Sequence, residues 1–126
     1  FSTRRSRFSP LAPSLSAAPV GNFVAIMKTN TVRTVTDLKY HLYENCVQSV
    51  GWQMRYLPLF HKRFTGKTAV SMREDFCGTG RIACEWAKKS AEHRAVGLDL
   101  DHQPLEFAER VNRSRLSSAA QARVRF

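Results

Sequence analysis

The sequence predicts an α/β domain in which a two-helix N-terminal cap precedes an incomplete parallel sheet. Helical periodicity over residues 37–66 gives way, from residue 67 onward, to short apolar runs that alternate with helical segments. A glycine-rich turn at residues 78–80 joins the first of these runs to the next helical segment. Alternating strands and helices form parallel sheets with right-handed crossovers. The expected order is therefore two helices followed by β-α-β-α-β.

Residues 1–36 are expected to form a disordered or transit-like basic segment outside the core. They hold five basic residues, no acidic residue and no periodic apolar face. Residues 1–26 are either an organelle targeting peptide or sequence upstream of a natural start at Met27. The first alternative places the protein in a mitochondrion or plastid, and the second places it in the cytoplasm.

The first cap helix is expected to begin with Thr36 or Asp37 as its N-cap and to end at Gly51. Small polar side chains at this position bond the free N–H groups of the first helical turn. Its expected buried face consists of Leu38, Leu42, Cys46 and Val50.

The second cap helix is expected over "WQMRYLPLFHKRF", residues 52–64, with Gly66 as its end. Pro58 interrupts this stretch and predicts a kink or break, because proline lacks the N–H of the helical hydrogen bond. The aromatic residues of this helix are interpreted as its packing face rather than as a substrate pocket.

The domain expected over residues 67–126 begins with the strand "KTAVSMREDF" and the turn "CGTG". A helix follows, and then the strand "RAVGLDL" and a helix that Asp101 caps. "ARVRF" opens a third strand. The expected buried residues of the two helices are Ile82, Ala83, Trp86, Ala87, Leu105, Ala108 and Val111 or Asn112. Because so few residues cannot bury both faces of a parallel sheet, we expect the first part of a longer, truncated domain.

The net charge of +10 belongs to the two ends of the chain. Residues 37–109 hold ten basic and ten acidic residues, so the centre is balanced and nucleic-acid binding is not favoured. No apolar run is long enough for a membrane span. Three cysteines without framework spacing indicate a reducing compartment, and no histidine or cysteine spacing is typical of a metal site.

The stretch "REDFCGTGR", residues 73–81, is the most informative part of the chain. Gly78, Gly80 and Ala83 satisfy the pattern G-x-G-x-x-G/A, and Asp99 follows Gly78 by 21 residues at the end of the second strand. A strand, a glycine turn, a helix and an acid at the next strand end form the adenosine-binding half of a Rossmann-like sheet. The sequence therefore predicts an adenosine-containing ligand.

Two ligand classes share this geometry. The pyrophosphate of a dinucleotide would be repelled by Glu74 and Asp75, which stand just before the turn. S-adenosylmethionine carries a sulfonium and an ammonium but no phosphate, so a carboxylate there attracts it. One of the two acids is expected to point away, because successive strand residues face opposite sides.

"EDFCGTG" followed by "AVGLDLDHQPLEFA" resembles motif I and the following acidic strand end of class I S-adenosylmethionine-dependent methyltransferases. "LYENCVQS", "REDFCGTG", "CEW" and "GLDLD" resemble more closely a methyltransferase-domain subfamily with an R-E-D-F-C-G-T signature. The resemblance covers about residues 40–126 and implies that the chain is the N-terminal fragment of such an enzyme.

The resemblance implies a set of cofactor-binding positions. Glu74 corresponds to the acid at the methionine end, Asp99 to the acid that bonds the ribose, and Leu100 to the apolar residue beside the adenine. Phe76 stands at the usual first glycine of the motif. The remaining loop positions beside the cofactor are Cys77, Gly78, Thr79 and Gly80. Methyl transfer needs no covalent nucleophile, so Cys77 is interpreted as a loop residue.

No residue of this chain is assigned a catalytic role. The resemblance implies that the groups that select and deprotonate an unspecified methyl acceptor follow a fourth strand, beyond Phe126, and that this chain alone is inactive. Two alternative functions remain open. They are a fragment of an NAD(P)-binding Rossmann oxidoreductase and a non-catalytic basic binding protein.

Overall fold

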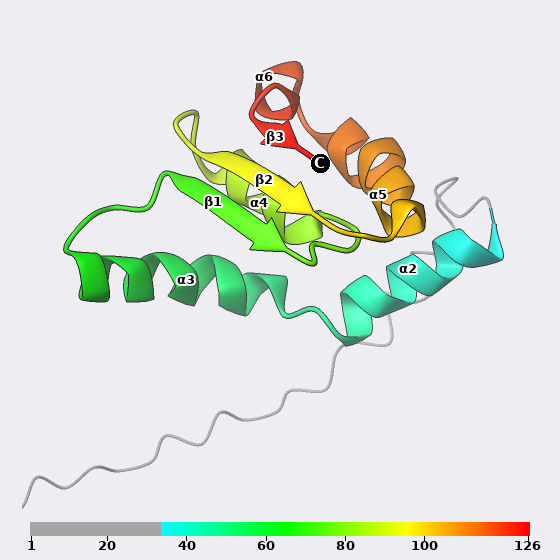
Figure 1. Cartoon of the computed structure of the whole chain (residues 1–126), viewed down its shortest axis with the longest axis horizontal. Coiled ribbons are helices and arrows are strands. Elements are labelled where there is room, and N and C mark those ends of the chain that lie inside the picture. The colour runs from blue at the N-terminus through cyan, green and yellow to red at the C-terminus, as the bar shows by residue number, and fades with distance from the viewer. Residues whose placement is uncertain (1–33) are drawn as a thin grey trace, which may run out of the picture.

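The computed structural model describes residues 34–126 and has an α/β fold (Figure 1). The basic segment expected over residues 1–36 lies, up to residue 33, outside the described residues. The described elements are α2 (Val35–Cys46), α3 (Val50–Thr65), β1 (Ser71–Asp75), α4 (Arg81–Lys89), β2 (Arg94–Leu98), α5 (His102–Phe107), the π-helical turn η1 (Ala108–Asn112), the 3₁₀ turn η2 (Arg113–Arg115), α6 (Ser118–Gln121) and β3 (Val124–Arg125). The expected order of two helices followed by β-α-β-α-β is confirmed, except that the short helix α6 also precedes β3.

The three described strands form one parallel sheet in the order β1-β2-β3. β1 and β2 pair from Ser71 with Arg94 to Asp75 with Leu98, so both strands end at the same edge of the sheet. The chain leaves that edge through residues 76–80 after β1 and through residues 99–101 after β2. The parallel register therefore brings the glycine turn beside Asp99.

The core lies between the sheet and α4, whose buried face is the expected one. Ile82, Ala83, Trp86 and Ala87 are all buried, together with Cys84. The Trp86 ring stacks on His93 at a centroid distance of 4.3 Å, and its Nε1 donates to the carbonyl of Val70 at 3.3 Å. Other members of this core are Ala95, Leu116, Ala120 and Val124.

The helix after β2 begins as expected, because the Asp101 side chain accepts from the N–H of Gln103 at 3.0 Å. Ala108, Val111 and Asn112 are buried, as expected. The expected burial of Leu105 is wrong, because Leu105 is half-buried and Phe107 occupies the interior. Pro104, Phe107, Ala108 and Val111 keep a regular helical spacing, so the buried face includes Pro104 rather than its neighbour Leu105.

The cap helices differ from the expected ones at their ends. α2 begins two or three residues earlier, with Thr34 as N-cap, and the Thr34 Oγ1 accepts from the N–H of Asp37 at 3.1 Å. α2 ends at Cys46, whereas Gly51 lies in the first turn of α3. Gly66 ends α3 as expected, with φ +72° in the left-handed region.

The expected break at Pro58 is absent, because α3 continues from Val50 through Thr65. A proline cannot donate to the carbonyl four residues before it, which here belongs to Met54. Lys89 Nζ of α4 donates to that carbonyl at 2.6 Å. A tertiary contact thus satisfies the group that the proline leaves unbonded.

The buried face expected for α2 is wrong. Its buried residues are Asp37, Tyr40, His41 and Glu44. Leu38 and Leu42 are only half-buried, Cys46 is exposed, and Val50 belongs to α3. Figure 1 shows α2 close to α5, beyond the carboxyl ends of the strands. Arg110 bonds Asp37 there, and the rings of Tyr40 and His41 pack against Phe107, so the buried side of α2 is not its leucine side.

The face of the sheet that points away from α4 is exposed among the described residues. Ser71, Arg73 and Asp75 of β1, and Arg94 and Leu98 of β2, all point to that side. No helix in the described part of the chain is long and apolar enough to span a bilayer.

Candidate functional site

The candidate site is the turn of residues 76–80, which connects β1 to α4. Phe76, Gly78 and Gly80 have φ values of +60°, +53° and +60°. Cys77 N–H donates to the carbonyl of Leu98 at 2.9 Å, and Gly80 N–H donates to the carbonyl of Cys77 at 2.8 Å. These bonds tie the turn to the end of β2 and bring it directly to the first residue of α4.

The two glycines of the turn meet different surroundings. A Cβ on Gly80 would lie 2.3 Å from the Phe126 ring and 3.2 Å from the Ala108 Cβ, so only glycine fits there. A Cβ on Gly78 would meet nothing within 4 Å. Gly80 therefore serves the packing of α4, whereas the backbone of Gly78 is open to a ligand.

Glu74 faces the N-terminus of α4. Its Oε2 accepts from the N–H of Ala83 at 3.2 Å, which supplies the cap that the side-chain-free N-cap Gly80 cannot provide. Burial raises the pKa of Glu74 to about 7, and the Ala83 N–H opposes that shift. Asp75 lies on the exposed face and pairs with Arg73 at 2.8 Å. As the strand alternation predicts, only one of the two acids faces α4.

Asp99 bonds the turn from the end of β2. Its Oδ1 accepts from the N–H of Asp101 at 2.9 Å, and its Oδ2 accepts from the N–H of Gly78 at 2.7 Å. These two N–H groups hold the pKa of Asp99 below its usual range, so Asp99 is ionised at neutral pH. Two acidic residues 25 positions apart therefore flank one glycine turn.

Cys77 lies inside the turn, with 1% of its surface exposed. A Cβ added to Gly97 would lie 2.8 Å from the Cys77 Sγ, so the thiol packs directly on β2. Burial raises its pKa to about 11, and the carboxyl groups of Glu74 and Asp99 add to that shift. A protonated, buried thiol is suited to packing and not to nucleophilic attack.

Phe76 and Leu100 stand exposed at the carboxyl edge of the sheet, at 81% and 89%. Among the described residues, Phe76 is the only non-glycine residue with positive φ, a conformation that glycine adopts without strain. The sequence marked Phe76 as a substituted glycine position, and its backbone adopts a conformation that suits glycine. Neither side chain contributes to the core.

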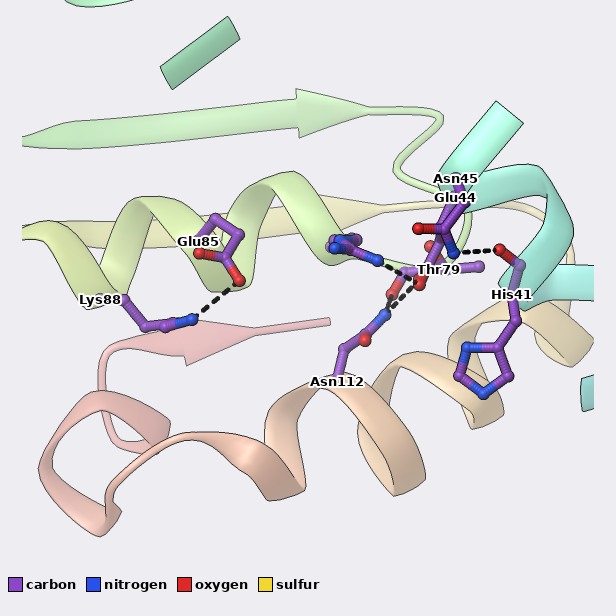
Figure 2. Close-up of polar contacts among 8 residues, drawn as sticks. His41, Glu44, Asn45, Thr79, Glu85, Lys88 and Asn112 are labelled. Atoms are coloured by element: carbon purple, nitrogen blue, oxygen red, sulfur yellow. Dashed lines mark hydrogen bonds and ion pairs between the residues drawn. The ribbon is translucent and has the colours of Figure 1, made fainter. Parts of the chain in front are cut away.

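A buried polar network joins the turn to α2 and η1 (Figure 2). Asn112 Nδ2 donates to Glu44 Oε1 at 2.6 Å and to the carbonyl of Thr79 at 2.9 Å. Arg81 Nη1 donates to Glu44 Oε2 at 3.0 Å. Glu44 therefore links the cap directly to Arg81 and, through Asn112, to Thr79.

Two hydroxyl groups near the turn are buried without a hydrogen-bond partner among residues 34–126. They belong to Tyr40 of α2 and to Thr79. Burial raises the pKa of Tyr40, and the nearby carboxylates of Asp101, Asp99 and Glu106 add to the effect. The Tyr40 hydroxyl thus lies on the side of the site that Asp99 occupies.

The sequence did not identify Tyr40, Glu44, Arg81 or Asn112 as part of the site. Their positions are far apart in the chain, and α2 was expected to bury its leucines. The one signal in the sequence is that Tyr40, His41 and Glu44 share one helical face. A helix with such a face packs against polar partners.

The arrangement favours a cationic ligand over an anionic one. Glu74 occupies an N–H group in the first turn of α4, and Asp99 occupies the N–H of Gly78. Free N–H groups at such positions are what binds phosphate, and a carboxyl group repels it. Open backbone at Gly78 and exposed apolar side chains at Phe76 and Leu100 leave room for a flat aromatic group.

Comparison of the chain with protein-family models, with curated proteins and with solved structures found no match.

Proposed function

We propose that this chain binds S-adenosylmethionine as the cofactor-binding unit of a class I methyltransferase with a Rossmann-like sheet. The observation that carries the proposal is the hydrogen bond from Ala83 N–H to Glu74 Oε2. It puts a carboxyl group in the first turn of α4, where a dinucleotide would have to place its pyrophosphate.

Charge separates the two ligand classes. A pyrophosphate at the start of α4 would meet the Glu74 carboxyl and the ionised Asp99. A sulfonium or an ammonium at the same place is attracted by both groups. Burial raises the pKa of Glu74 to about 7, and a bound cation would favour its charged form.

Each site residue has a role in this proposal. Glu74 faces the methionine ammonium, and Asp99 accepts from the ribose hydroxyls while it holds Gly78. Phe76 and Leu100 supply exposed apolar surface for the adenine. The bound cofactor supplies an electrophilic methyl group, and the chain holds it in place for an in-line displacement.

The test measures binding of S-adenosylhomocysteine to the 126-residue chain by isothermal titration calorimetry. Asp99→Asn is expected to weaken binding at least about tenfold, because a charge-assisted hydrogen bond becomes a neutral one. The matched control is Asp75→Asn, whose side chain faces the exposed side of the sheet. It is expected to leave affinity unchanged.

Binding of NADH without binding of S-adenosylhomocysteine would overturn the proposal in favour of an oxidoreductase. Equal losses in the Asp99→Asn and Asp75→Asn variants would show that the glycine turn is not the binding site.

A further inference from the structure

The buried network of Figure 2 bonds the glycine turn to η1 through Asn112 and, through Glu44, to α2. We propose that Asn112 positions the glycine turn for its ligand and that Glu44 of α2 orients the Asn112 amide. This inference rests on the proposed function, since the ligand in question is S-adenosylmethionine. It assigns to the cap helix a part in binding that goes beyond covering the domain.

The geometry of the Asn112 amide carries the proposal. A carboxamide NH₂ group has two hydrogens, and here the two acceptors are Glu44 Oε1 at 2.6 Å and the Thr79 carbonyl at 2.9 Å. Both residues that bear these side chains are buried, with 2% of Glu44 and 6% of Asn112 exposed. Because water has little access, losing either acceptor leaves a buried donor unsatisfied.

The Thr79 carbonyl is a sensitive point of the turn. The N–H of the preceding residue, Gly78, bonds Asp99, and Gly80, the next residue, begins α4 as its N-cap. A rotation of the peptide group between Thr79 and Gly80 would break the bond from Gly80 N–H to the Cys77 carbonyl and disturb the adjacent Gly78 backbone, which is open to a ligand. Asn112 holds this peptide group by its oxygen.

The π-helical turn η1 places Asn112 where it can reach the turn. Residues 108–112 form one wider helical turn between α5 and η2, and Asn112 is its last residue. Such turns shift the side chains that follow and are frequent at functional sites. Glu44 then sets the amide plane from the opposite side, with Arg81 bonded to its second oxygen.

Exchanging the amide and carboxyl groups of Asn112 and Glu44 separates positioning of the glycine turn from stabilisation of the fold. In Asn112→Asp, a second carboxylate faces both Glu44 and the Thr79 carbonyl, so all donors at this position are lost. In the double variant Glu44→Gln with Asn112→Asp, the Gln amide donates to the new carboxylate and its oxygen still accepts from Arg81. The swap restores the link from α2 to η1 but supplies no donor to Thr79.

Three quantities are measured for each variant. They are the free energy of unfolding, the amide exchange rates of Cys77, Gly78 and Gly80 relative to that of Ala95 in β2, and the affinity for S-adenosylhomocysteine. The three turn amides and the Ala95 amide are all hydrogen-bonded, so each reports a local opening. Glu109→Gln, which removes the exposed ion pair with Arg113, is the matched control.

The single variant Asn112→Asp is expected to weaken affinity and to accelerate turn exchange by about tenfold each, which corresponds to one buried hydrogen bond. The swap is expected to recover most of the unfolding free energy while exchange at the turn stays fast and affinity stays low. Glu44→Gln alone, the mildest change, is expected to accelerate turn exchange more than exchange at Ala95.

The proposal would be overturned if the double variant regained slow exchange at the turn and full affinity along with its stability. The network would then act only on stability. Equal acceleration at the turn and at Ala95 in Glu44→Gln would also overturn it. If the unaltered chain does not bind S-adenosylhomocysteine, the proposed function fails, while the exchange rates still decide whether Asn112 holds the turn.

Discussion

α2 and α4 both carry an apolar stripe at helical spacing, but only α4 buries it. The buried residues of α4 are the ones that its periodicity predicts, and its hydrophobic face meets the sheet. α2 instead buries Asp37, Tyr40, His41 and Glu44 against α5, η1 and the glycine turn. Apolar periodicity therefore identified the buried face of α4 but not that of α2, where an ion pair and the contact of Tyr40 with Phe107 and Val111 decide which side is buried.

The two helices also differ in how their N-termini are capped. Thr34 caps α2 from the adjacent position in the chain, through a bond to the N–H of Asp37. α4 begins at Gly80, which has no side chain, and its cap comes from Glu74 on the neighbouring strand. A local cap is readable from sequence, whereas a tertiary cap requires the fold.

The largest expected effect tests the two apolar stripes directly. Ile82→Ala in α4 removes a buried side chain and is expected to cost about 3 kcal/mol of unfolding free energy. Leu42→Ala in α2 is expected to cost less than about 1 kcal/mol, because that side chain is already half-exposed. Urea unfolding followed by circular dichroism measures both. Equal costs would mean that α2 packs through its leucines.

The second effect concerns the raised pKa of Glu74, the residue of β1 that caps α4. The folded-state pKa of Glu74, about 7, is raised above the ordinary value of 4.5, so its ionisation opposes folding. The stability that its protonated form allows is fully present below about pH 4.5 and is lost as the pH rises through about 7. Glu74→Gln removes this loss and keeps an acceptor for the N–H of Ala83.

Glu74→Gln is therefore expected to raise the unfolding free energy by about 2 kcal/mol at pH 8, a figure discounted because the side chain is only partly buried. At pH 4.5 the variant and the unaltered chain are expected to be equally stable. Urea unfolding at both pH values measures the difference. A constant difference across this range would contradict a raised pKa at Glu74.

The smallest effect concerns Phe76, in the turn between β1 and α4. Phe76→Gly is expected to raise the unfolding free energy by about 1 kcal/mol, because the left-handed backbone at φ +60° costs a non-glycine residue more than it costs glycine. Leu100→Gly, at an equally exposed position without positive φ, is expected to lower stability slightly. Thermal unfolding compares the two variants. A gain in stability of the Leu100→Gly variant would contradict the explanation from the backbone conformation of Phe76.

Phe76 links this strain to the proposed site. An exposed aromatic side chain in a strained turn gives the fold no packing in return. We expect Phe76→Gly to weaken binding of S-adenosylhomocysteine while it stabilises the chain. Titration calorimetry measures the affinity of Phe76→Gly for S-adenosylhomocysteine, and thermal unfolding of the same preparation measures its stability.

Much of the fold follows from local sequence. Gly66 and Asp101 end and begin their helices as expected, since each acts through its own backbone or the next two residues. The break expected at Pro58 is missing, and Lys89, 31 positions away, bonds the Met54 carbonyl that the proline leaves without its helical donor. Leu105 is not buried as expected, because Pro104 and Phe107 occupy the buried face of α5.

The candidate site divides in the same way. Glu74, Gly78 and Asp99 were found from sequence, because a strand, a glycine turn and a second strand fix their spacing along the chain. Tyr40, Glu44 and Asn112 were not, because nothing near them in sequence shows which surface they meet.

The sequence by itself determined the order of the elements, the position of the glycine turn and the alternation that sends Glu74 and Asp75 to opposite faces. These properties depend on backbone conformation and on residues close together in the chain. Only the tertiary structure decided which side of α2 is buried, how α4 is capped and how Asn112 bonds the turn. Each of these depends on hydrogen bonds between segments whose approach no local preference specifies.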